Sequence, residues 1–301
     1  MKIAYFIGAY KLPDQMVRLV RKLESDTSIF LIHIDKKTDA ATFRRMWEPL
    51  RHHPSVHFLK RHPVYWGDSG VLRASLKAIK ELVDSHVEYD YLIYLTSQDY
   101  PIKSNDQIGD ALQKAHGRSF MQYFPLPDRR WREENGGLDR VAYRYYHWYG
   151  RWFVIRRNGK LMKMLSAGLG TRLAAALPIE RPMPGNLTPY GGSALWCLSR
   201  ACAEYVHGFL KQDRRILPFF NSVLIPDEIF YQTILLNSPL QPTVVDDEVH
   251  YIAWPELSGP HPDILGLPDF DRFMATDKLF ARKFDATVDS KVLDRIDAET
   301  C

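Results

Sequence analysis

Short apolar runs alternate with longer amphipathic segments along the first half of the chain. The runs have the length of buried strands and cover residues 3–7, 28–34, 56–59, 91–96 and 120–124. The segments between them repeat apolar residues at helical spacing, and they begin at Pro13, near Ala40, at Asp68 or Ser69, and at Ser104. Strands that alternate with helices predict an α/β fold, in which a mostly parallel sheet carries helices on both faces.

The second half continues this alternation. Residues 190–193 (YGGS) lead into a strand, and their paired glycines either let the backbone approach a ligand closely or make a turn. Residues 226–235 (PDEIFYQTIL) predict a half-buried helix, because proline suits the first helical position and acids suit the first turn. Glu228 should stand at the tip of that helix, where a carboxylate can take a proton from a substrate, although an ordinary helix start has the same residues. A further strand is expected within 244–254.

Three polar groups follow strands of the predicted sheet. They are Asp35-Lys36-Lys37, Tyr65-Trp66-Gly67 and Ser97-Gln98-Asp99. In open parallel sheets, ligands bind outside the carboxyl ends of the strands. Each group alone is an ordinary loop, but their shared position predicts a ligand site along one edge of the sheet.

The middle of the chain has a different character. Residues 129–163 interleave cations with aromatic rings, and residues 162–177 are more apolar. Such a segment could stack on sugar rings, lie at a membrane interface or bind single-stranded nucleic acid. It could equally be an excursion that packs onto the core. Later, Arg282 and Lys283 stand between apolar residues, as either a diphosphate clamp or an exposed basic pair.

Composition narrows the class of protein. The 301 residues are 46% hydrophobic and 25% charged, which is typical of a globular chain. A net charge of +4 fits an anionic ligand and is too mild to indicate nucleic-acid binding by itself. The three cysteines form no CxxC pair, so we expect a reducing compartment and no structural zinc. Met1 and Lys2 lead directly into a strand-like run, so no signal peptide is expected, and no apolar run reaches the roughly 20 residues of a spanning helix.

Several common catalytic motifs are missing from the sequence. There is no GxGxxG after the first strand and no GxxxxGK(S/T), so the two common phosphate-cradling loops are absent. There is also no GxSxG elbow and no HExxH helix. These absences disfavour a dehydrogenase, a P-loop enzyme, a serine hydrolase and a zinc protease.

Seven stretches resemble, in order, the motifs of one enzyme family. They are IAYFIGAY, LIHIDKKTD, VYWGDSGVLRASL, YLIYLTSQDYPIKSNDQI, GGSALWCLS, PDEIFYQTI and LFARKFD. Together they are similar to the core-2/I-branching glycosyltransferases of glycosyltransferase family 14, in a compact bacterial-like form, and to the peptide O-xylosyltransferases of that family. The resemblance covers residues 2–285 and is weakest across residues 129–189.

The resemblance implies a GT-A type fold with one catalytic domain over residues 1–301, in which residues 129–189 are an insertion on the acceptor side. It implies inverting transfer from a UDP-sugar, with UDP-GlcNAc or UDP-xylose favoured and no divalent metal or other cofactor. We expect the acceptor to be a hydroxyl of a glycan or lipid-linked glycan. We also expect a cytoplasmic enzyme, whose residues 129–177 either contact the inner face of the membrane or pack on the core. The alternative is a nucleotide-sugar or glycan-binding protein without catalysis, and nucleic-acid binding is not expected.

The same resemblance implies roles for single residues. Glu228 falls on the family's catalytic base, Asp35 on its nucleotide-contacting aspartate, and Arg282-Lys283 on its diphosphate-binding pair. Inverting transfer needs one base for the acceptor hydroxyl, and without a metal it needs fixed cations for the leaving diphosphate. The other residues expected to contact the donor are Ala9, Val64, Tyr65, Trp66, Gln98, Asp99, Ser193 and Ala194. Those expected on the acceptor side are Trp148, Trp152 and Asp227, and no metal ligands are predicted.

Four positions depart from the family's pattern. Tyr10 stands where histidine is frequent, and His250 stands where arginine is common, which leaves a second diphosphate contact open. Ala194-Leu195 replaces the Asp-Trp that often follows the GGS motif, so different sugar-ring contacts are expected there. Asp269-Phe270-Asp271 spells the DxD metal motif of other GT-A enzymes, but it lies late in the chain, directly after Pro268. We interpret that match as a coincidence.

Overall fold

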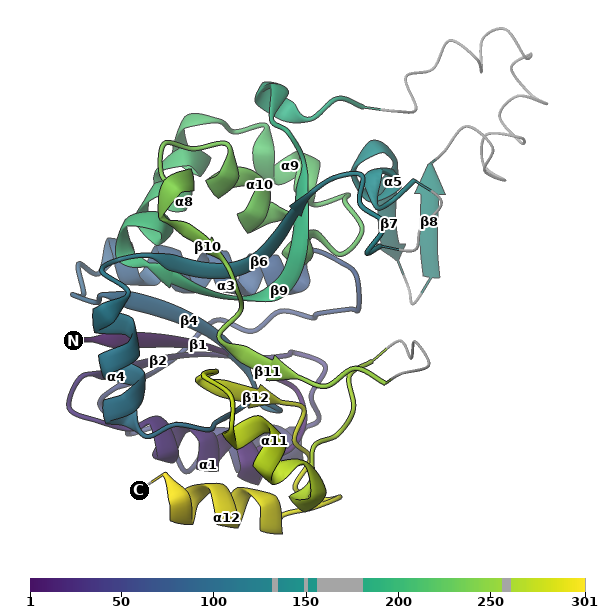
Figure 1. Ribbon diagram of the computed structural model, residues 1–301. Helices are drawn as coiled ribbons and strands as arrows, with labels where there is room; N and C mark the ends of the chain where they lie inside the picture. The colour runs from purple at the N-terminus through teal and green to yellow at the C-terminus, as the bar shows by residue number, and fades with distance from the viewer. Residues whose placement is uncertain (132–134, 149–150, 156–180, 256–260, 301) are drawn as a thin grey trace, which may run out of the picture.

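A seven-stranded sheet forms the centre of the computed structural model, which describes residues 1–131, 135–148, 151–155, 181–255 and 261–300 (Figure 1). The strand order is β10-β6-β9-β4-β1-β2-β3. β9 runs antiparallel to β4 and β6, whereas β1 pairs in parallel with β2 and β4, β2 with β3, and β6 with β10. The strands are β1 (Ile3–Ala9), β2 (Ser28–Ile34), β3 (Val56–Phe58), β4 (Tyr91–Thr96), β6 (Ser119–Pro125), β9 (Tyr190–Ser199) and β10 (Val244–Asp246).

Helices cover both faces of this sheet, as the alternating pattern predicts. One face carries α1 (Pro13–Leu23), α2 (Ala40–Trp47), α4 (Asn105–Lys114), α11 (Phe270–Met274) and α12 (Lys291–Glu299). The other face carries α3 (Gly70–Asp84), α8 (Arg200–Gln212), α9 (Ile216–Phe220) and α10 (Phe230–Leu236). Neighbouring residues of β1, such as Tyr5 and Phe6, enter separate hydrophobic clusters, because successive side chains of a strand point to opposite faces. The predicted α/β fold with a mostly parallel sheet is confirmed, and it is the arrangement expected of a GT-A type enzyme.

Side-chain caps form two of the predicted helix starts, those of α3 and α4. Ser104 accepts the Gln107 amide at 3.2 Å while the Gln107 side chain accepts the Ser104 amide at 2.9 Å, which is a complete capping box for α4. At α3, Asp68 rather than Ser69 provides the cap, because Asp68 Oδ1 accepts the Gly70 amide at 2.7 Å. This cap also shapes a loop of the candidate site.

A second, three-stranded sheet joins the late part of the chain to the edge of the first. It contains β11 (His250–Ile252), β12 (Phe280–Arg282) and β5 (Tyr100–Pro101), with β12 in the middle. Because β5 follows the loop after β4, its pairing with β12 brings Arg282 beside that loop. The Phe284 amide accordingly donates to the Gln98 carbonyl at 2.8 Å. The strand expected within 244–254 is therefore two short strands, β10 and β11, which belong to different sheets.

The chain around Glu228 differs from the predicted helix. Pro226–Glu228 forms a separate 3-10 turn, η2, and α10 begins only after Ile229, whose φ of −130° is not helical. Every residue of α10 is buried, so this helix is not half-buried as expected. Charged side chains cannot enter such a helix without a large desolvation cost, so the two acids remain in the turn ahead of it. Glu228 stands at the end of a tight turn, not in the first turn of an α-helix.

The middle segment forms a small unit beside the ends of β6 and β9 (Figure 1). It contains α5 (Leu138–Ala142) and a hairpin of β7 (Arg144–Trp148) and β8 (Arg151–Ile155). The Tyr145 amide donates to the Ser222 carbonyl at 2.9 Å, which ties β7 to the chain ahead of η2. The apolar stretch noted within 162–177 lies outside the described residues. The remaining described elements are the 3-10 turns η1 (Pro184–Asn186), η3 (Gln241–Thr243) and η4 (Leu267–Asp269).

Candidate active site

A cleft of about 1150 Å³ opens at the edge of the central sheet where the parallel strands end. Its walls come from the end of β1, the loops after β2, β3 and β4, the start of β9, the turn η2 and the residues at the end of β12. These segments meet because the carboxyl ends of parallel strands share one edge, to which the antiparallel β9 adds its amino end. The sequence-predicted residues that line the cleft are Ala9, Asp35, Val64, Tyr65, Trp66, Gln98, Ser193, Ala194, Asp227, Glu228, Arg282 and Lys283.

Asp35 holds two loops of the cleft together. Its Oδ1 accepts the Lys37 amide at 2.9 Å and the Val64 amide at 3.3 Å, and its Oδ2 lies 3.5 Å from Lys37 Nζ. Lys37 Nζ in turn lies 4.0 Å from the centre of the Tyr65 ring. The loops after β2 and β3 are therefore joined by one buried carboxylate and one cation.

The loop ahead of α3 is fixed by contacts on both sides. Asp68 Oδ1 accepts the Tyr65 amide at 3.2 Å. Gly67 has a φ of 79°, a left-handed conformation that favours glycine, and its carbonyl accepts the Ile225 amide at 2.8 Å. Through that bond the loop is fastened to the turn η2 that carries Glu228. Trp66 is 72% exposed and lines the cleft from this loop.

The two tryptophans predicted on the acceptor side lie in different places. Trp152 packs against the loop ahead of α3, because a Cβ added to Gly67 would come within 3.3 Å of its ring. The His147 ring has its centre 4.1 Å from that of Tyr65 and 5.2 Å from that of Trp152. Trp148 is 66% exposed and does not line the cleft. The hairpin thus reaches the candidate site through Trp152.

Arg282 and Lys283 form the cationic part of the cleft at the end of β12, while Lys37 and Arg130 line it elsewhere. Arg282 Nε lies 3.1 Å from Asp99 Oδ1, and Asp99 is wholly buried. Asp99 also accepts the Thr96 amide, so its side chain turns inward while that of Gln98 lines the cleft. Asp99 therefore supports Arg282 from behind and does not face the space where a donor would lie, in contrast to its predicted donor contact. Burial, together with the charge of Arg282, lowers the pKa of Lys283.

His250 lies behind the same part of the cleft, on β11. It is buried, and its ring stacks on Phe280 with 5.3 Å between the ring centres. Burial lowers the pKa of His250 to about 4, so the ring is neutral at pH 7. Where the family commonly has an arginine, this chain has a group that adds no positive charge.

The acidic part of the cleft consists of Asp227 and Glu228. Glu228 Oε2 lies 2.8 Å from Arg140 Nη1, and the Glu228 side chain is 30% exposed. Burial raises the pKa of the Asp227 carboxyl to about 7, and the neighbouring Glu228 carboxylate adds to the rise. The two adjacent carboxyls therefore differ near pH 7, because one is paired with a cation and the other is partly protonated.

Sequence reasoning missed Glu248, which lines the cleft from the connection between β10 and β11. Burial raises the pKa of its carboxyl, and the nearby Ser193 hydroxyl opposes that rise. Glu248 therefore adds a carboxyl group next to the GGS motif. No local pattern marks it, because it lies in a polar connection, Asp246-Asp247-Glu248, like many others.

Sequence reasoning also missed Trp131, which lines the cleft from the middle segment. A Cβ added to Gly191 would come within 2.5 Å of the Trp131 ring, and a Cβ added to Gly192 would come within 1.8 Å of the Gln122 carbonyl oxygen. The paired glycines therefore make room for a ring of the protein and for the neighbouring strand. The paired glycines were thus the local signal for a bulky neighbour, although the sequence alone suggested that they serve a ligand or a turn.

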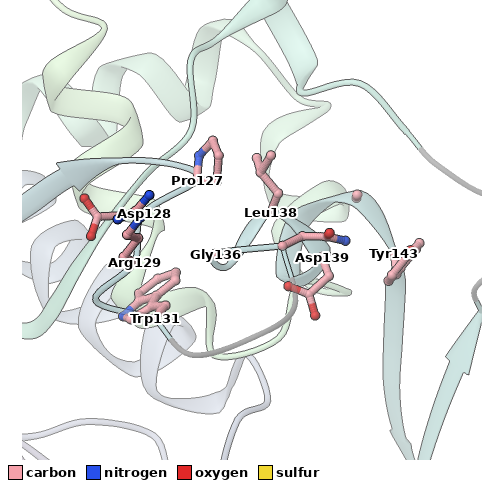
Figure 2. Close-up of a pocket in the computed structure, with 10 residues that line it drawn as sticks. Pro127, Asp128, Arg129, Trp131, Gly136, Leu138, Asp139 and Tyr143 are labelled. Atoms are coloured by element: carbon pink, nitrogen blue, oxygen red, sulfur yellow. The ribbon is translucent and has the colours of Figure 1, made fainter.

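A second hollow of about 760 Å³ lies in the middle segment (Figure 2). Trp131 belongs to its wall and to the wall of the cleft. Arg129, Asp139 and Tyr143 contribute further polar and aromatic surface to it. Trp131 therefore lies in the walls of both the cleft and a hollow of the segment predicted on the acceptor side.

The described residues contain no group of three or more His, Cys, Asp or Glu side chains placed to hold a metal ion. The Asp269-Phe270-Asp271 motif does not line the cleft. Asp269 Oδ2 accepts the Gly266 amide at 3.0 Å, and Asp271 Oδ1 lies 3.3 Å from Arg295 Nη2. In this fold the motif serves a turn and a surface ion pair.

Comparison with known proteins identifies the family. The model of the core-2/I-branching enzymes matches residues 3–269. The chain belongs to the core-2/I-branching enzyme family. That membership makes it a glycosyltransferase, and it agrees with a cleft at the strand ends that holds both a carboxylate pair and a cation pair.

Similar curated proteins are xylosyltransferases. The chain is 26% identical to xylosyltransferase 2 of Rattus norvegicus, over 99% of this chain and 33% of that protein. It is 25% identical to xylosyltransferase 1 of Homo sapiens, over 99% of this chain and 30% of that protein. It is 26% identical to xylosyltransferase oxt of Drosophila pseudoobscura pseudoobscura, over 93% of this chain and 31% of that protein. The chain thus spans about a third of the length of these relatives.

A solved structure from Bacillus anthracis, described as a glucose-1-phosphate thymidylyltransferase, is 9% identical over 68% of this chain and 74% of that one, with a TM-score of 0.31. This slight likeness has no bearing on activity. In the described part of the chain, no helix combines the length and the apolar character needed to cross a membrane.

Proposed function

We propose that the protein is an inverting, metal-independent glycosyltransferase that moves a sugar from a UDP-sugar to a hydroxyl of a glycan. The observation that carries this proposal is that Glu228 and the Arg282-Lys283 pair line one cleft. An inverting transfer needs a base for the acceptor and cations for the leaving diphosphate, both within reach of one sugar. UDP-xylose is a candidate donor because xylosyltransferases are among the relatives, and UDP-GlcNAc is a candidate because of the branching-enzyme family.

The donor would bind in the part of the cleft that is lined by the loops after β2 and β3. Asp35 would accept a hydrogen bond from the uracil or the ribose, with Tyr65 or Trp66 packed on the base. The diphosphate would then reach Arg282 and Lys283, whose fixed charges stabilise the leaving group without a metal. Because burial lowers the pKa of Lys283, an anion bound there also favours its charged form.

The chemistry is a single displacement. The acceptor O–H proton passes to the Glu228 carboxylate while the acceptor oxygen forms its bond to the anomeric carbon. On the other side of that carbon, the bond to the diphosphate oxygen breaks, and its electron pair leaves with UDP. The configuration inverts, and the site needs a base but no nucleophile of its own.

The acceptor would approach from the middle segment, residues 129–189. Trp131 lines the cleft from this segment, Trp152 packs against Gly67 in the wall of the cleft, and Asp227 lies beside the proposed base. A lipid-linked glycan is one acceptor of this class. For it, a cytoplasmic enzyme held peripherally at the inner face of the membrane is the corresponding arrangement.

The experiment is a thermal-shift screen of UDP-sugars, followed by measurement of UDP release with the best binder and a panel of glycans. Glu228→Gln should keep donor affinity and lose turnover by about a hundredfold or more. Near wild-type turnover in this variant would remove Glu228 as the base. Donor binding by the wild type with no UDP release for any acceptor would favour the non-catalytic binding protein.

A further inference from the structure

Arg140 is a buried cation that reaches the candidate base from behind the cleft. It is 7% exposed, does not line the cleft, and lies on α5, 88 residues before Glu228. Its Nη1 donates a hydrogen bond to Glu228 Oε2 at 2.8 Å. A charged hydrogen bond of this kind orients a carboxylate and favours its ionised form.

The surroundings of Arg140 fix its position. Its guanidinium carbon lies 3.8 Å from the centre of the Trp131 ring. That ring fits because Gly137 and Gly191 lack a side chain, since added Cβ atoms would come within 2.0 and 2.5 Å of it. The Arg140 carbonyl accepts the Leu224 amide at 3.2 Å, which bonds α5 to the chain just ahead of η2.

Other titratable groups act on the Asp227 carboxyl of η2. Among the described residues, besides Arg140 on α5, they are Asp68 before α3, Tyr94 on β4 and Tyr231 on α10. Burial raises the pKa of Asp227 to about 7, and the Glu228 charge adds to that rise. Two neighbouring carboxyls that repel each other share one proton unless their surroundings differ. Arg140 supplies a difference, because it contacts Glu228.

We propose that Arg140 is a positioning residue, which keeps Glu228 ionised and aimed at the acceptor hydroxyl while the shared proton resides on Asp227. This inference rests on the proposed role of Glu228 as the base. The middle segment then completes the catalytic centre and does not only border the acceptor. Transfer stays active at a lower pH than it would with an unassisted pair of carboxyls.

The test is the pH dependence of kcat/KM, measured on the full chain with the UDP-sugar that gives turnover. Arg140→Gln keeps a hydrogen-bonding side chain and removes the charge. We expect the acidic limb of its kcat/KM profile to move up by about one pH unit or more, because an opposite charge in contact with a carboxyl shifts its pKa by that amount. Activity should fall about tenfold on the acidic side and recover toward wild type at high pH. The donor KM should not change, because the cationic part of the cleft is untouched.

Arg181→Gln is the matched control. Arg181 is also partly buried with its guanidinium carbon 3.8 Å from an aromatic ring, that of Phe219, but its hydrogen bonds go to Val141, Ser222 and Phe219. We expect this variant to leave the acidic limb in place. If Arg140→Gln also leaves the limb in place, or loses activity equally at every pH, the positioning role is wrong.

Two further variants separate this inference from the proposed function. If Glu228→Gln stays active, the proposed function fails whatever Arg140→Gln does. If Glu228→Gln is inactive and the limb of Arg140→Gln does not move, only the role of Arg140 fails. Should Arg140→Gln not fold, Arg140→Lys replaces it, because lysine keeps the charge but not the planar fork of the guanidinium. Its kcat/KM should fall with the limb unmoved, and a wild-type kcat/KM would overturn the proposal.

Discussion

The cationic and acidic parts of the cleft are built alike, with opposite signs. In the cationic part, Arg282 lines the cleft and pairs with Asp99, which is wholly buried. In the acidic part, Glu228 lines the cleft and pairs with Arg140, which is buried as well. A buried ion pair adds little to stability on its own. The hidden counter-charge is better understood as the support that orients the exposed group for its substrate.

The two parts differ in how the hidden partner is reached along the chain. Asp99 lies in the short loop after β4, and its neighbour Gln98 lines the cleft. One loop therefore supplies both a cleft-lining residue and the counter-charge of Arg282. Arg140 comes from the middle segment, 88 residues before Glu228. Arg282 is thus supported by a loop of the sheets, whereas Glu228, the proposed base, depends on a separate unit. A change at Arg140 should therefore affect the proposed base while sparing the cationic part of the cleft.

The largest effect that tests this comparison is expected in the cationic part. Lys283→Ala should raise the donor KM and lower kcat, with kcat/KM reduced by about a hundredfold, because one fixed cation facing the leaving diphosphate is lost. EDTA should leave the activity of the wild type unchanged. Steady-state kinetics with and without EDTA measure both effects. Activity abolished by EDTA and restored by manganese would move the diphosphate site to a metal.

In the acidic part, Asp227 should make the stability of the protein depend on pH. Folding raises the pKa of Asp227 from an ordinary value of 3.8 to about 7, mainly through burial. The folded protein therefore binds this proton more tightly than the unfolded chain, and the resulting stability is fully present below about pH 4 and lost as the pH rises through 7. Asp227→Asn removes this dependence. Between pH 4 and 8 the wild type should lose about 2–4 kcal/mol of unfolding free energy relative to the variant.

Chemical denaturation of the wild type and Asp227→Asn at several pH values measures that difference. The amide has the shape of the carboxyl and no charge, so packing changes little. A difference in unfolding free energy that is constant from pH 4 to 8 would show that Asp227 titrates in the same way folded and unfolded. The acidic part would then lack the unequal carboxyls that set it apart from the cationic part.

The part of the cleft at the strand ends could be predicted well from the sequence because its residues follow strands. A strand is a local apolar pattern, and the residues after parallel strands share one edge of a sheet, so Asp35, Tyr65 and Gln98 could be placed together before the structure was known. Asp99 was misplaced because neighbouring residues in a tight loop point different ways. Only the inward hydrogen bond from the Thr96 amide decides that Asp99 is the support and not the wall.

The support of the base could not be predicted, because it depends on contacts between distant segments. In the sequence, Arg140 does not differ from the other arginines of a basic segment. Its position follows from tertiary contacts such as the hydrogen bond between its carbonyl and the Leu224 amide. Likewise, residues 226–235 carry the signals of a helix start. The two acids nevertheless lie in a separate turn, because every residue of α10 is buried. In both cases, tertiary packing decides what local propensity leaves open.

The smallest effect is expected beyond the two charged parts, on the hairpin of the middle segment. Trp152→Ala removes a ring that lies against Gly67, whose carbonyl holds Ile225 just ahead of η2. We expect the acceptor KM to rise about fivefold, as for a loss of about 1 kcal/mol, and the donor KM to rise by less, because the ring also packs on the loop of Tyr65 and Trp66. Trp148→Ala is the matched control on the same hairpin, because that ring is 66% exposed and away from the cleft. Its acceptor KM should stay within about twofold of the wild type. Equal effects of the two substitutions would mean that the hairpin acts as a general surface. A donor KM that rises as much as the acceptor KM in Trp152→Ala would mean that the ring supports the donor loop and not the acceptor.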